Sequence, residues 1–160
     1  HDGQAAVPGP GNMIGCSAEI IEQENEIVVL SKEILPDSGG AGRFQGGNGQ
    51  RVRLMNDSGS ELAVSFLAAR DRFAPRGFLS GQPGQPRSYR LDGQPISPKG
   101  RHAWPPGGVI ETLEAGGGGI GDPAERDPRA VALDLALGRI TEGFARRHSP
   151  APRARPEPAR

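Results

Sequence analysis

The side chains best suited to chemistry lie in a glycine-rich segment, residues 36–50, which reads PDSGGAGRFQGGNGQ. Successive glycine N–H groups can form a concave site for a phosphate or a carboxylate. Asp37, Ser38 and Arg43 are therefore candidates for contacts with a substrate or another subunit, and the Arg43 guanidinium can hold a carboxylate through two parallel hydrogen bonds. The candidate glycines of this segment are Gly39, Gly40, Gly42, Gly46 and Gly47. The structural alternative is a pair of tight turns at a sheet corner, with Arg43 paired to Asp37.

A second glycine-rich segment, residues 116–128, adds Gly117, Gly118, Gly119 and Asp122 as candidates. It matches G-x-G-x-x-G after an expected strand. However, Asp122 and the proline after it interrupt the place where a phosphate-capping helix should begin, and no βαβ unit surrounds the match. Neither segment ends in G-K-[ST]. We therefore expect a substrate or subunit contact rather than a nucleotide site, and helix capping is the favoured role of Asp122.

The remaining polar residues do not form a complete catalytic set. His1, His102 and His148 are scattered in the sequence and lack a second ligand at metal spacing. Cys16 has no neighbouring base that would activate it, and no serine lies in a G-x-S-x-G turn. The sequence therefore leaves the catalytic residues unknown and predicts that this segment binds neither a metal nor a cofactor.

The composition favours short strands joined by many turns. Glycine and proline contribute 25 and 16 of the 160 residues, which is unfavourable for long helices. The formal net charge is zero and aromatic residues make up 4% of the chain, whereas a nucleic-acid-binding domain is basic with interleaved aromatic residues. We therefore exclude nucleic acid as a partner, and the length predicts one domain.

The sequence also bears on the compartment. No apolar run approaches the roughly 20 residues that span a bilayer, so we expect no membrane contact. Cys16 is the single cysteine, which excludes an internal disulfide and fits a reducing compartment. We expect a cytoplasmic protein. Residues 17–37 are rich in acids and residues 126–160 are rich in arginine; these runs are usually solvated faces, and attraction of a partner is the alternative.

The first half of the chain is expected to form strands. Clusters of β-branched residues in 17–35 favour strands, and a helix that brings Ile20 next to Glu24 is the alternative. Apolar residues alternate in 51–54 and again in 62–66, on either side of an Asn-Asp-Ser-Gly connection. This pattern predicts a β-hairpin.

The second half is expected to continue with loops and short strands. Residues 70–86 predict a long irregular segment, because three prolines interrupt it. Residues 88–96 predict a weaker hairpin around an Asp-Gly turn, and Pro95 suits a sheet edge because it cannot donate to a ladder. Residues 104–108 predict a turn, and residues 109–113 a strand.

The C-terminal part changes to helical patterns. Asp127 can cap a helix that begins at the following proline, and Gly138 should end it. Thr141 can cap a second short helix that runs through Phe144 to Arg147. Together these elements predict an α+β fold that is mainly β, with roughly seven short antiparallel strands, hairpins and a C-terminal helical segment.

Five segments together resemble the hydantoinase B/oxoprolinase family. They follow the family's order, starting with residues 36–50 and continuing as RDRFAPRG (70–77), GQPG (81–84), PKG (98–100) and GGGGIGDPAERDP (116–128). The resemblance runs from about Gly11 to Arg147, and family members are several times longer. It implies that residues 1–15 are a linker or the end of a missing upstream domain, residues 16–148 the C-terminal portion of a family domain, and residues 149–160 a disordered tail.

The resemblance also implies a function. Proteins of this family take part in the ATP-dependent opening of cyclic amides such as hydantoins and 5-oxoproline, and relatives serve in ATP-dependent ketone carboxylases. The ATP chemistry then belongs to a hydantoinase A-type partner subunit or domain, metal ligands lie upstream of residue 1, and this chain is inactive alone. The alternatives are a non-catalytic β-rich subunit-interaction domain, a fragment of a ketone carboxylase subunit, and a truncated gene product without activity.

Overall fold

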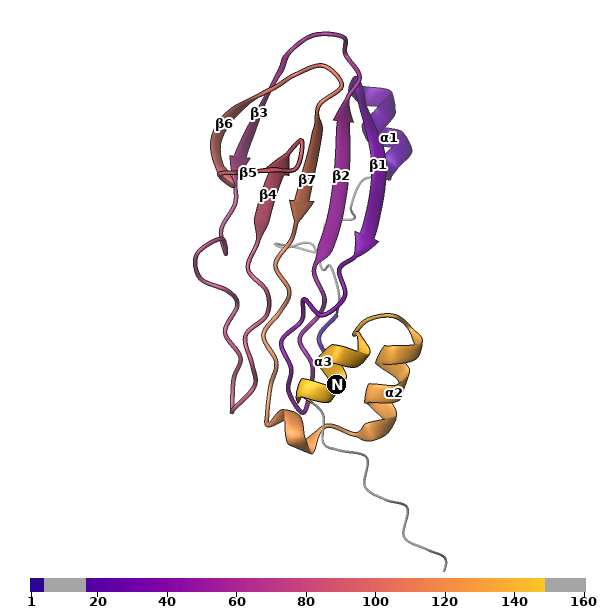
Figure 1. Ribbon diagram of the computed structural model, residues 1–160, viewed down its shortest axis with the longest axis vertical. Coiled ribbons are helices and arrows are strands. Elements are labelled where there is room, and N and C mark those ends of the chain that lie inside the picture. The colour runs from indigo at the N-terminus through magenta and orange to yellow at the C-terminus, as the bar shows by residue number, and fades with distance from the viewer. Residues whose placement is uncertain (5–16, 149–160) are drawn as a thin grey trace, which may run out of the picture.

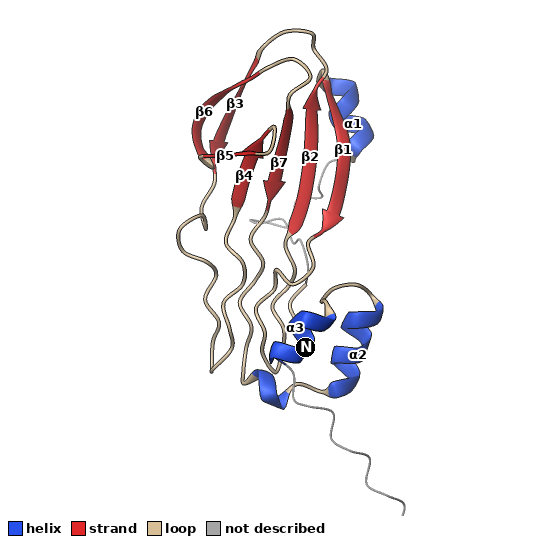
Figure 2. Cartoon of the chain, viewed as in Figure 1, coloured by secondary structure: helices blue, strands red, loops and turns tan. Residues whose placement is uncertain are grey.

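The computed structural model describes residues 1–4 and 17–148 and is built on two antiparallel sheets (Figures 1 and 2). The larger sheet contains, in spatial order, β1 (Ile27–Ile34), β2 (Gln50–Asn56), β7 (Val109–Leu113), β4 (Ser88–Leu91) and β5 (Gln94–Ile96). The smaller sheet pairs β3 (Leu62–Leu67) with β6 (Lys99–Trp104). The helices are α1 (Ala18–Glu24), the 3-10 turn η1 (Pro123–Glu125), α2 (Pro128–Ala136) and α3 (Glu142–His148). The predicted α+β, mainly β fold is confirmed.

The two sheets meet through aromatic side chains. The ring of Phe66 on β3 packs edge-on against Tyr89 on β4, with the ring centroids 4.6 Å apart, a favourable geometry for aromatic pairs. Trp104 at the end of β6 is buried, and its indole N–H donates to the Gly108 carbonyl at 2.8 Å. Burial of these rings and of Ile110 on β7 holds the smaller sheet against the larger one.

The hairpin predicted for residues 88–96 is confirmed. β4 and β5 pair antiparallel, with Leu91 opposite Gln94. The turn residues Asp92 and Gly93 both have positive φ, 49° and 79°, as a two-residue type I′ connection requires. Pro95 lies on β5, the outermost strand of the larger sheet, as its missing N–H predicts.

The hairpin predicted for residues 51–66 is wrong, although both of its strands exist. β2 pairs with β1 on one edge and with β7 on the other. A strand has only two edges, so β3 cannot join β2 and pairs with β6 instead. The buried Asn56 directs this change of sheet, because its side-chain amide donates to the carbonyls of Ser60 and Trp104, each at 2.8 Å.

The strand prediction for residues 17–35 holds from Ile27 onward, whereas residues 18–24 form helix α1. The Ser17 hydroxyl caps this helix by accepting the Ile20 N–H at 3.4 Å. This hydroxyl satisfies an N–H group that the first helical turn leaves free. The cap therefore outweighed the preference of Ile20 and Ile21 for a strand. Strand β6 was not predicted, because Lys99–Trp104 lacks apolar alternation.

The two C-terminal helices follow the predicted caps. The Asp127 carboxylate accepts the Arg129 N–H at 2.8 Å, and Gly138 has φ 65° after the last turn of α2. The Thr141 hydroxyl accepts the Phe144 N–H at 3.2 Å. Phe144 and Ala145 of α3 pack with Ile140 and with Ala41 of the glycine-rich segment in a small core. The helices are thereby fastened to the segment that carries the candidate site.

Some predictions lie outside this description. The structure does not describe residues 5–16 or 149–160, so the linker, the position of Cys16, the boundary at residue 16 and the tail stay predictions. Among the described helices, none is long and apolar enough to cross a membrane.

Candidate functional site

Three extended stretches of chain lie side by side between the larger sheet and helices α2 and α3, and the two that follow β1 and β3 run away from the sheet and back again (Figure 1). They comprise residues 36–49, 75–87 and 114–121, and we call them the glycine array. Hydrogen bonds join all three: Gly40 N–H donates to Gly117 O at 2.8 Å, Gly119 N–H to Gln82 O at 2.9 Å, and Gln82 N–H to Ala41 O at 2.7 Å. Each segment therefore bonds to more than one neighbour without forming a regular sheet.

The segment Gly116–Gly119 lies between the others. A Cβ atom on Gly116 would collide with the Ser38 carbonyl, one on Gly118 with the Arg76 carbonyl, and one on Gly119 with the Ala41 carbonyl. Gly116 and Gly119, three residues apart, thus face the same run, residues 38–41, whereas Gly117 faces Gly46 and Gly47 and Gly118 faces residues 76–77. This periodicity is that of an extended helix with three residues per turn.

The same spacing recurs in the other two segments. Gly81 and Gly84, three residues apart, both face the 116–119 segment, and Gly46 and Gly49 both face the 114–117 segment. The glycines are needed because backbone packs directly against backbone. The proposed pair of tight turns at a sheet corner does not describe this packing. Contact of these glycines with a substrate or subunit stays a prediction.

Asp37 and Ser38 anchor the glycine array. The Asp37 carboxylate accepts the N–H and the hydroxyl of Thr141, both at 2.7 Å, and so ties the array to the start of α3. Ser38 is fully buried; its hydroxyl donates to Leu35 O at 2.6 Å and accepts the Gly49 N–H at 2.8 Å. The contacts within the chain therefore occupy both side chains.

Arg43 and Asp122 lie at the far end of the array. Arg43 does not pair with Asp37; its exposed guanidinium lies 3.7 Å from the Glu125 carboxylate and 5.6 Å from the centre of the Phe44 ring. Asp122 accepts the Ala124 N–H at 2.9 Å and caps η1, in agreement with the favoured capping role. The structure therefore separates Arg43 and Asp122 from the anchoring pair Asp37 and Ser38.

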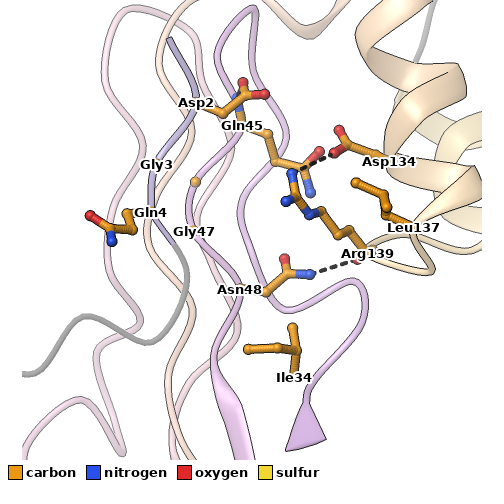
Figure 3. A pocket seen from close by; sticks show the side chains of 11 residues that line it. Asp2, Gly3, Gln4, Ile34, Gln45, Gly47, Asn48, Asp134, Leu137 and Arg139 are labelled. Carbon is orange, nitrogen blue, oxygen red and sulfur yellow. Dashed lines mark hydrogen bonds and ion pairs between the residues drawn. The ribbon is translucent and has the colours of Figure 1, made fainter. Parts of the chain in front are cut away.

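A cavity of about 280 Å³ opens between the array, α2 and residues 2–4 (Figure 3). Its apolar walls are Ile34 and Leu137, and the backbone of Gly46 and Gly47 forms part of it. Its polar lining includes Asp2, Gln45, Asn48, Asp134 and Arg139. The cavity thus brings the predicted candidates Gly46 and Gly47 together with side chains that the sequence analysis did not single out.

A buried ion-pair network supports one side of the cavity. The Arg126 guanidinium, 5% exposed, donates to Asp134 at 2.5 Å and to the two carboxylate oxygens of Asp2 at 2.7 and 2.9 Å. Burial alone would lower the pKa of Arg126, but the hydrogen bonds and charges of the two carboxylates reverse this and raise it. Arg126 therefore stays charged and links α2 to the first residues of the chain.

Two hydrogen bonds from the array hold the loop that follows α2. Asn48 donates its amide N–H to the Arg139 carbonyl at 2.6 Å, and Asp37 donates its backbone N–H to the same oxygen at 3.1 Å. The Arg139 side chain is left half exposed, with Nη1 3.6 Å from Asp134. The backbone of Arg139 is thus fixed while its guanidinium keeps donors for another partner.

Sequence signals for these residues existed but were weak. Asp134 is a carboxylate within an otherwise apolar helical run, and such a residue is either exposed or paired in the interior. Arg126 and Asn48 lie inside the family-like motifs. Arg126 is 124 residues from Asp2 and Asn48 is 91 residues from Arg139, so spacing alone does not reveal these two contacts, whereas Asp134 is 8 residues from Arg126. Among the described residues, no group of His, Cys, Asp and Glu could hold a metal ion.

The Asp2 carboxyl should make stability depend on pH. Burial raises its pKa, but hydrogen bonds from Arg126 and from the Gln45 N–H, with the charge of Arg126, outweigh burial and hold the pKa below the usual 3.8. Such a group stabilises the fold above its unfolded pKa, and the contribution is lost as the pH falls through the folded pKa. We therefore expect Asp2→Asn to lower the free energy of unfolding at neutral pH.

Urea unfolding of both chains at neutral pH and at a pH well below 3.8 measures this linkage. The difference between the chains should shrink in acid, because the wild-type carboxyl is then protonated. An equal difference at both pH values would contradict the ionic role of Asp2.

Comparison with known proteins identifies the family. The family model described as hydantoinase B/oxoprolinase matches residues 1–123. The chain belongs to the hydantoinase B/oxoprolinase family. This confirms the resemblance that the glycine-rich motifs carry, and the whole glycine array lies within the matched region of the hydantoinase B/oxoprolinase model.

Individual hydantoinase B/oxoprolinase relatives are much longer. The chain is 33% identical over 127 residues to an uncharacterized protein of Methanocaldococcus jannaschii, covering 77% of the chain and 22% of that relative. It is 27% identical over 146 residues to caprolactamase subunit beta of Pseudomonas jessenii, covering 85% of the chain and 25% of that relative. The chain therefore spans about a quarter of the relatives' length.

A solved structure supports the fold. The nucleotide-free structure of acetone carboxylase, from work on ATP-dependent acetone carboxylation, superposes with a TM-score of 0.75. The match covers 92% of this chain and 25% of the other, at 20% sequence identity. At that identity the similarity shows the fold alone.

Proposed function

We propose that this chain is the C-terminal portion of a B-type subunit in an ATP-dependent cyclic-amide hydrolase of the hydantoinase or 5-oxoprolinase type. The observation that carries the proposal is the family match over residues 1–123. The caprolactamase relative supports it, because a lactam is a cyclic amide. We place the protein in the cytoplasm, in accord with its single cysteine.

The proposal assigns a different role to each subunit or portion of the enzyme. A hydantoinase A-type subunit or domain uses ATP, and metal ligands belong to the portion of the B-type subunit that precedes this chain. This chain supplies the rigid glycine array and one wall of the substrate site, and it binds no cofactor itself. The relative's name, caprolactamase subunit beta, supports a partner subunit.

The candidate residues divide by exposure. The buried candidates, which shape the array from within, are Ser38, Gly39, Gly40, Gly42, Gly46 and Gly119. The half-buried ones are Asp37, Gly47, Gly117 and Gly118, and Arg43 and Asp122 are exposed. We propose that the less buried members contact the substrate or the preceding portion of the subunit.

The test is reconstitution. The chain is combined with the preceding portion of its subunit and the A-type partner, and ring opening of 5-oxoproline and of hydantoin is measured with and without ATP. We expect turnover only when every part and ATP are present. A complete complex that turns over neither compound with ATP would overturn the hydrolase proposal, and carboxylation of a ketone by that complex would favour the carboxylase alternative.

A second candidate function is a non-catalytic subunit-interaction domain. One observation favours it: apolar side chains gather at the far end of the array, where Phe44 and Ile120 exchange backbone hydrogen bonds of 2.9 Å and Phe78 donates to Gly119 O. Phe78 and Leu79 are each 66% exposed, and contiguous exposed apolar surface marks interaction sites. Complex formation that survives without any turnover in the reconstitution would support this function.

A further inference from the structure

Four apolar side chains form an exposed surface at the far end of the glycine array, which we call the apolar tip: Phe44, Phe78, Leu79 and Ile120. Ile120 exchanges backbone hydrogen bonds of 2.9 Å with Phe44 and forms a second, parallel bridge with Phe78. Residues paired in this way point to the same side, so these three side chains share one face. Phe44 and Ile120 are 38% and 47% exposed, and Phe78 and Leu79 are 66% exposed. A contiguous apolar surface of this kind marks a place where another surface binds.

The turn that presents Leu79 is unfavourable for the chain alone. The Gly81 N–H donates to the Phe78 carbonyl at 3.0 Å, and Leu79 and Ser80 have φ of 49° and 70°. This is a two-residue type I′ turn, which favours Asn and Gly because φ is positive at both central positions. The Asp-Gly turn between β4 and β5 follows that preference. Leu79 thus adopts a strained conformation without becoming buried, and strain of this kind is typical of binding sites.

Charges of both signs border the apolar tip. Arg43, next to Phe44, lies 3.7 Å from Glu125, and Asp122 follows Ile120 by two residues; all three charged side chains are exposed. An anionic membrane surface attracts clusters of basic residues, and this mixed rim is not such a cluster. An apolar centre with a polar rim is the arrangement of a protein–protein interface. The tip therefore fits a protein surface that has an apolar pocket.

The first residues of the chain indicate which protein surface this is. Asp2 accepts the Gln45 N–H and Gly3 donates to the Gln45 carbonyl, both at 2.8 Å, so these residues lie beside the neighbour of Phe44. The chain spans about a quarter of its relatives' length. In the complete subunit of the proposed function, the larger portion is joined to residue 1 and therefore emerges close to the tip. A portion tethered at this place meets the tip at a high effective concentration.

We propose that the apolar tip docks into an apolar pocket of the preceding portion of the same B-type subunit, with Phe78 and Leu79 at the centre of the contact. The inference rests on the proposed function for the existence of that portion, and it identifies the surface through which this chain binds it. Burial of Leu79 in the complete subunit then offsets the strain of its turn.

The first test compares this chain alone with the complete subunit, without ATP or the A-type partner, by hydroxyl-radical footprinting. Oxidation of Phe78 and Leu79 should be about tenfold slower in the complete subunit, because an interface core is packed as densely as a protein interior. Leu67 on β3, 98% exposed, shows that the reagent reaches an exposed leucine of the chain alone. Equal oxidation in both forms would overturn the proposal, as would protection that requires the A-type partner, phosphatidylserine vesicles or a high concentration of the chain alone.

The second test replaces the turn with Leu79→Asn and Ser80→Gly together. The urea midpoint of the chain alone should rise, because both new residues suit positive φ, whereas Phe78 in the complete subunit should lose its protection, because the apolar contact is removed. Leu67→Asn makes the same change outside the tip and should leave Phe78 protected. A higher midpoint with unchanged protection of Phe78 would overturn the proposal, and if the double variant does not fold, the first test decides.

The outcomes for the apolar tip and for the proposed function can be told apart. The footprint is measured without ATP and does not depend on turnover. ATP-dependent turnover by a complete enzyme whose tip stays unprotected would overturn the docking and leave the proposed function standing. A protected tip in a complete enzyme without turnover would support the docking and overturn the hydrolase proposal.

Discussion

Replacing Gly116 with alanine should destabilise the chain by about 3 kcal/mol or more, the upper part of the range for overpacked interiors. The added Cβ would collide with the carbonyl carbon and oxygen of Ser38. These atoms cannot retreat, because the Ser38 side chain is fully buried and its carbonyl accepts the Gln85 N–H at 2.8 Å. Alanine also reduces the entropy of the unfolded chain, but this gain is worth at most about 1 kcal/mol.

Gly143→Ala is the matched control for this glycine. A Cβ at position 143 would meet its nearest atoms, Arg147 Nη1 and Thr141 Oγ1, at 3.6 and 3.7 Å, an ordinary contact distance. Because this glycine lies in α3, alanine should stabilise the helix by up to about 1 kcal/mol. Urea unfolding followed by circular dichroism measures both variants. Equal stability of Gly116→Ala and the wild-type chain would contradict direct backbone packing in the array.

Asp134→Ala should cost about 3 kcal/mol, near the lower end of the range for a buried charge that loses a partner. The Asp134 and Arg126 side chains are 6% and 5% exposed and lie 2.5 Å apart. Removal of Asp134 leaves the Arg126 guanidinium in the interior with only the partly exposed Asp2. The penalty arises mainly from the Arg126 charge that stays buried, because this charge is no longer hydrated and has lost one of its two carboxylate partners.

A double variant tests that explanation. Arg126→Met with Asp134→Leu removes both buried charges, and apolar replacement of a buried pair is often neutral or stabilising. The double variant should therefore be more stable than Asp134→Ala alone. Glu142→Ala is the control for an exposed pair, since Glu142 and Arg146 are both largely exposed, and its effect on unfolding should be small. A double variant less stable than the single one would show that packing, not the stranded charge, causes the loss.

The predictions for Gly116 and Asp134 concern structures on opposite sides of the same cavity, the glycine array and helix α2. The array supplies Gln45, Gly46 and Gly47 to the cavity, and the Arg126 network positions α2 and its Leu137 opposite them.

Local sequence signals were enough for several elements. The caps of Asp127 and Thr141, the Asp-Gly turn at Asp92 and the edge position of Pro95 were all predicted correctly, because each depends on residues within a few positions of one another. The family resemblance was also readable from motifs alone, since these motifs retain the order and spacing of their glycines.

Strand pairing was not readable in the same way. The alternation in β2 and β3 identified both strands correctly, yet a hairpin between them was ruled out because β1 and β7 occupy both edges of β2. Helix α1 was given only as the alternative to a strand, because β-branched residues favour strands in general, and the Ser17 cap decided the local competition. Propensity describes a residue by itself, whereas pairing depends on which edges remain free.

By itself, the sequence determined the family, the mainly β class, the C-terminal helices and the presence of two glycine-rich segments that demand an unusual backbone. Only the tertiary structure decided why those glycines are needed and where the cavity lies. Backbone packing in the array and the pairing of Arg126 with Asp2 join residues far apart in the chain. Such contacts leave no local spacing to detect, because their geometry exists only once the separate segments have packed together.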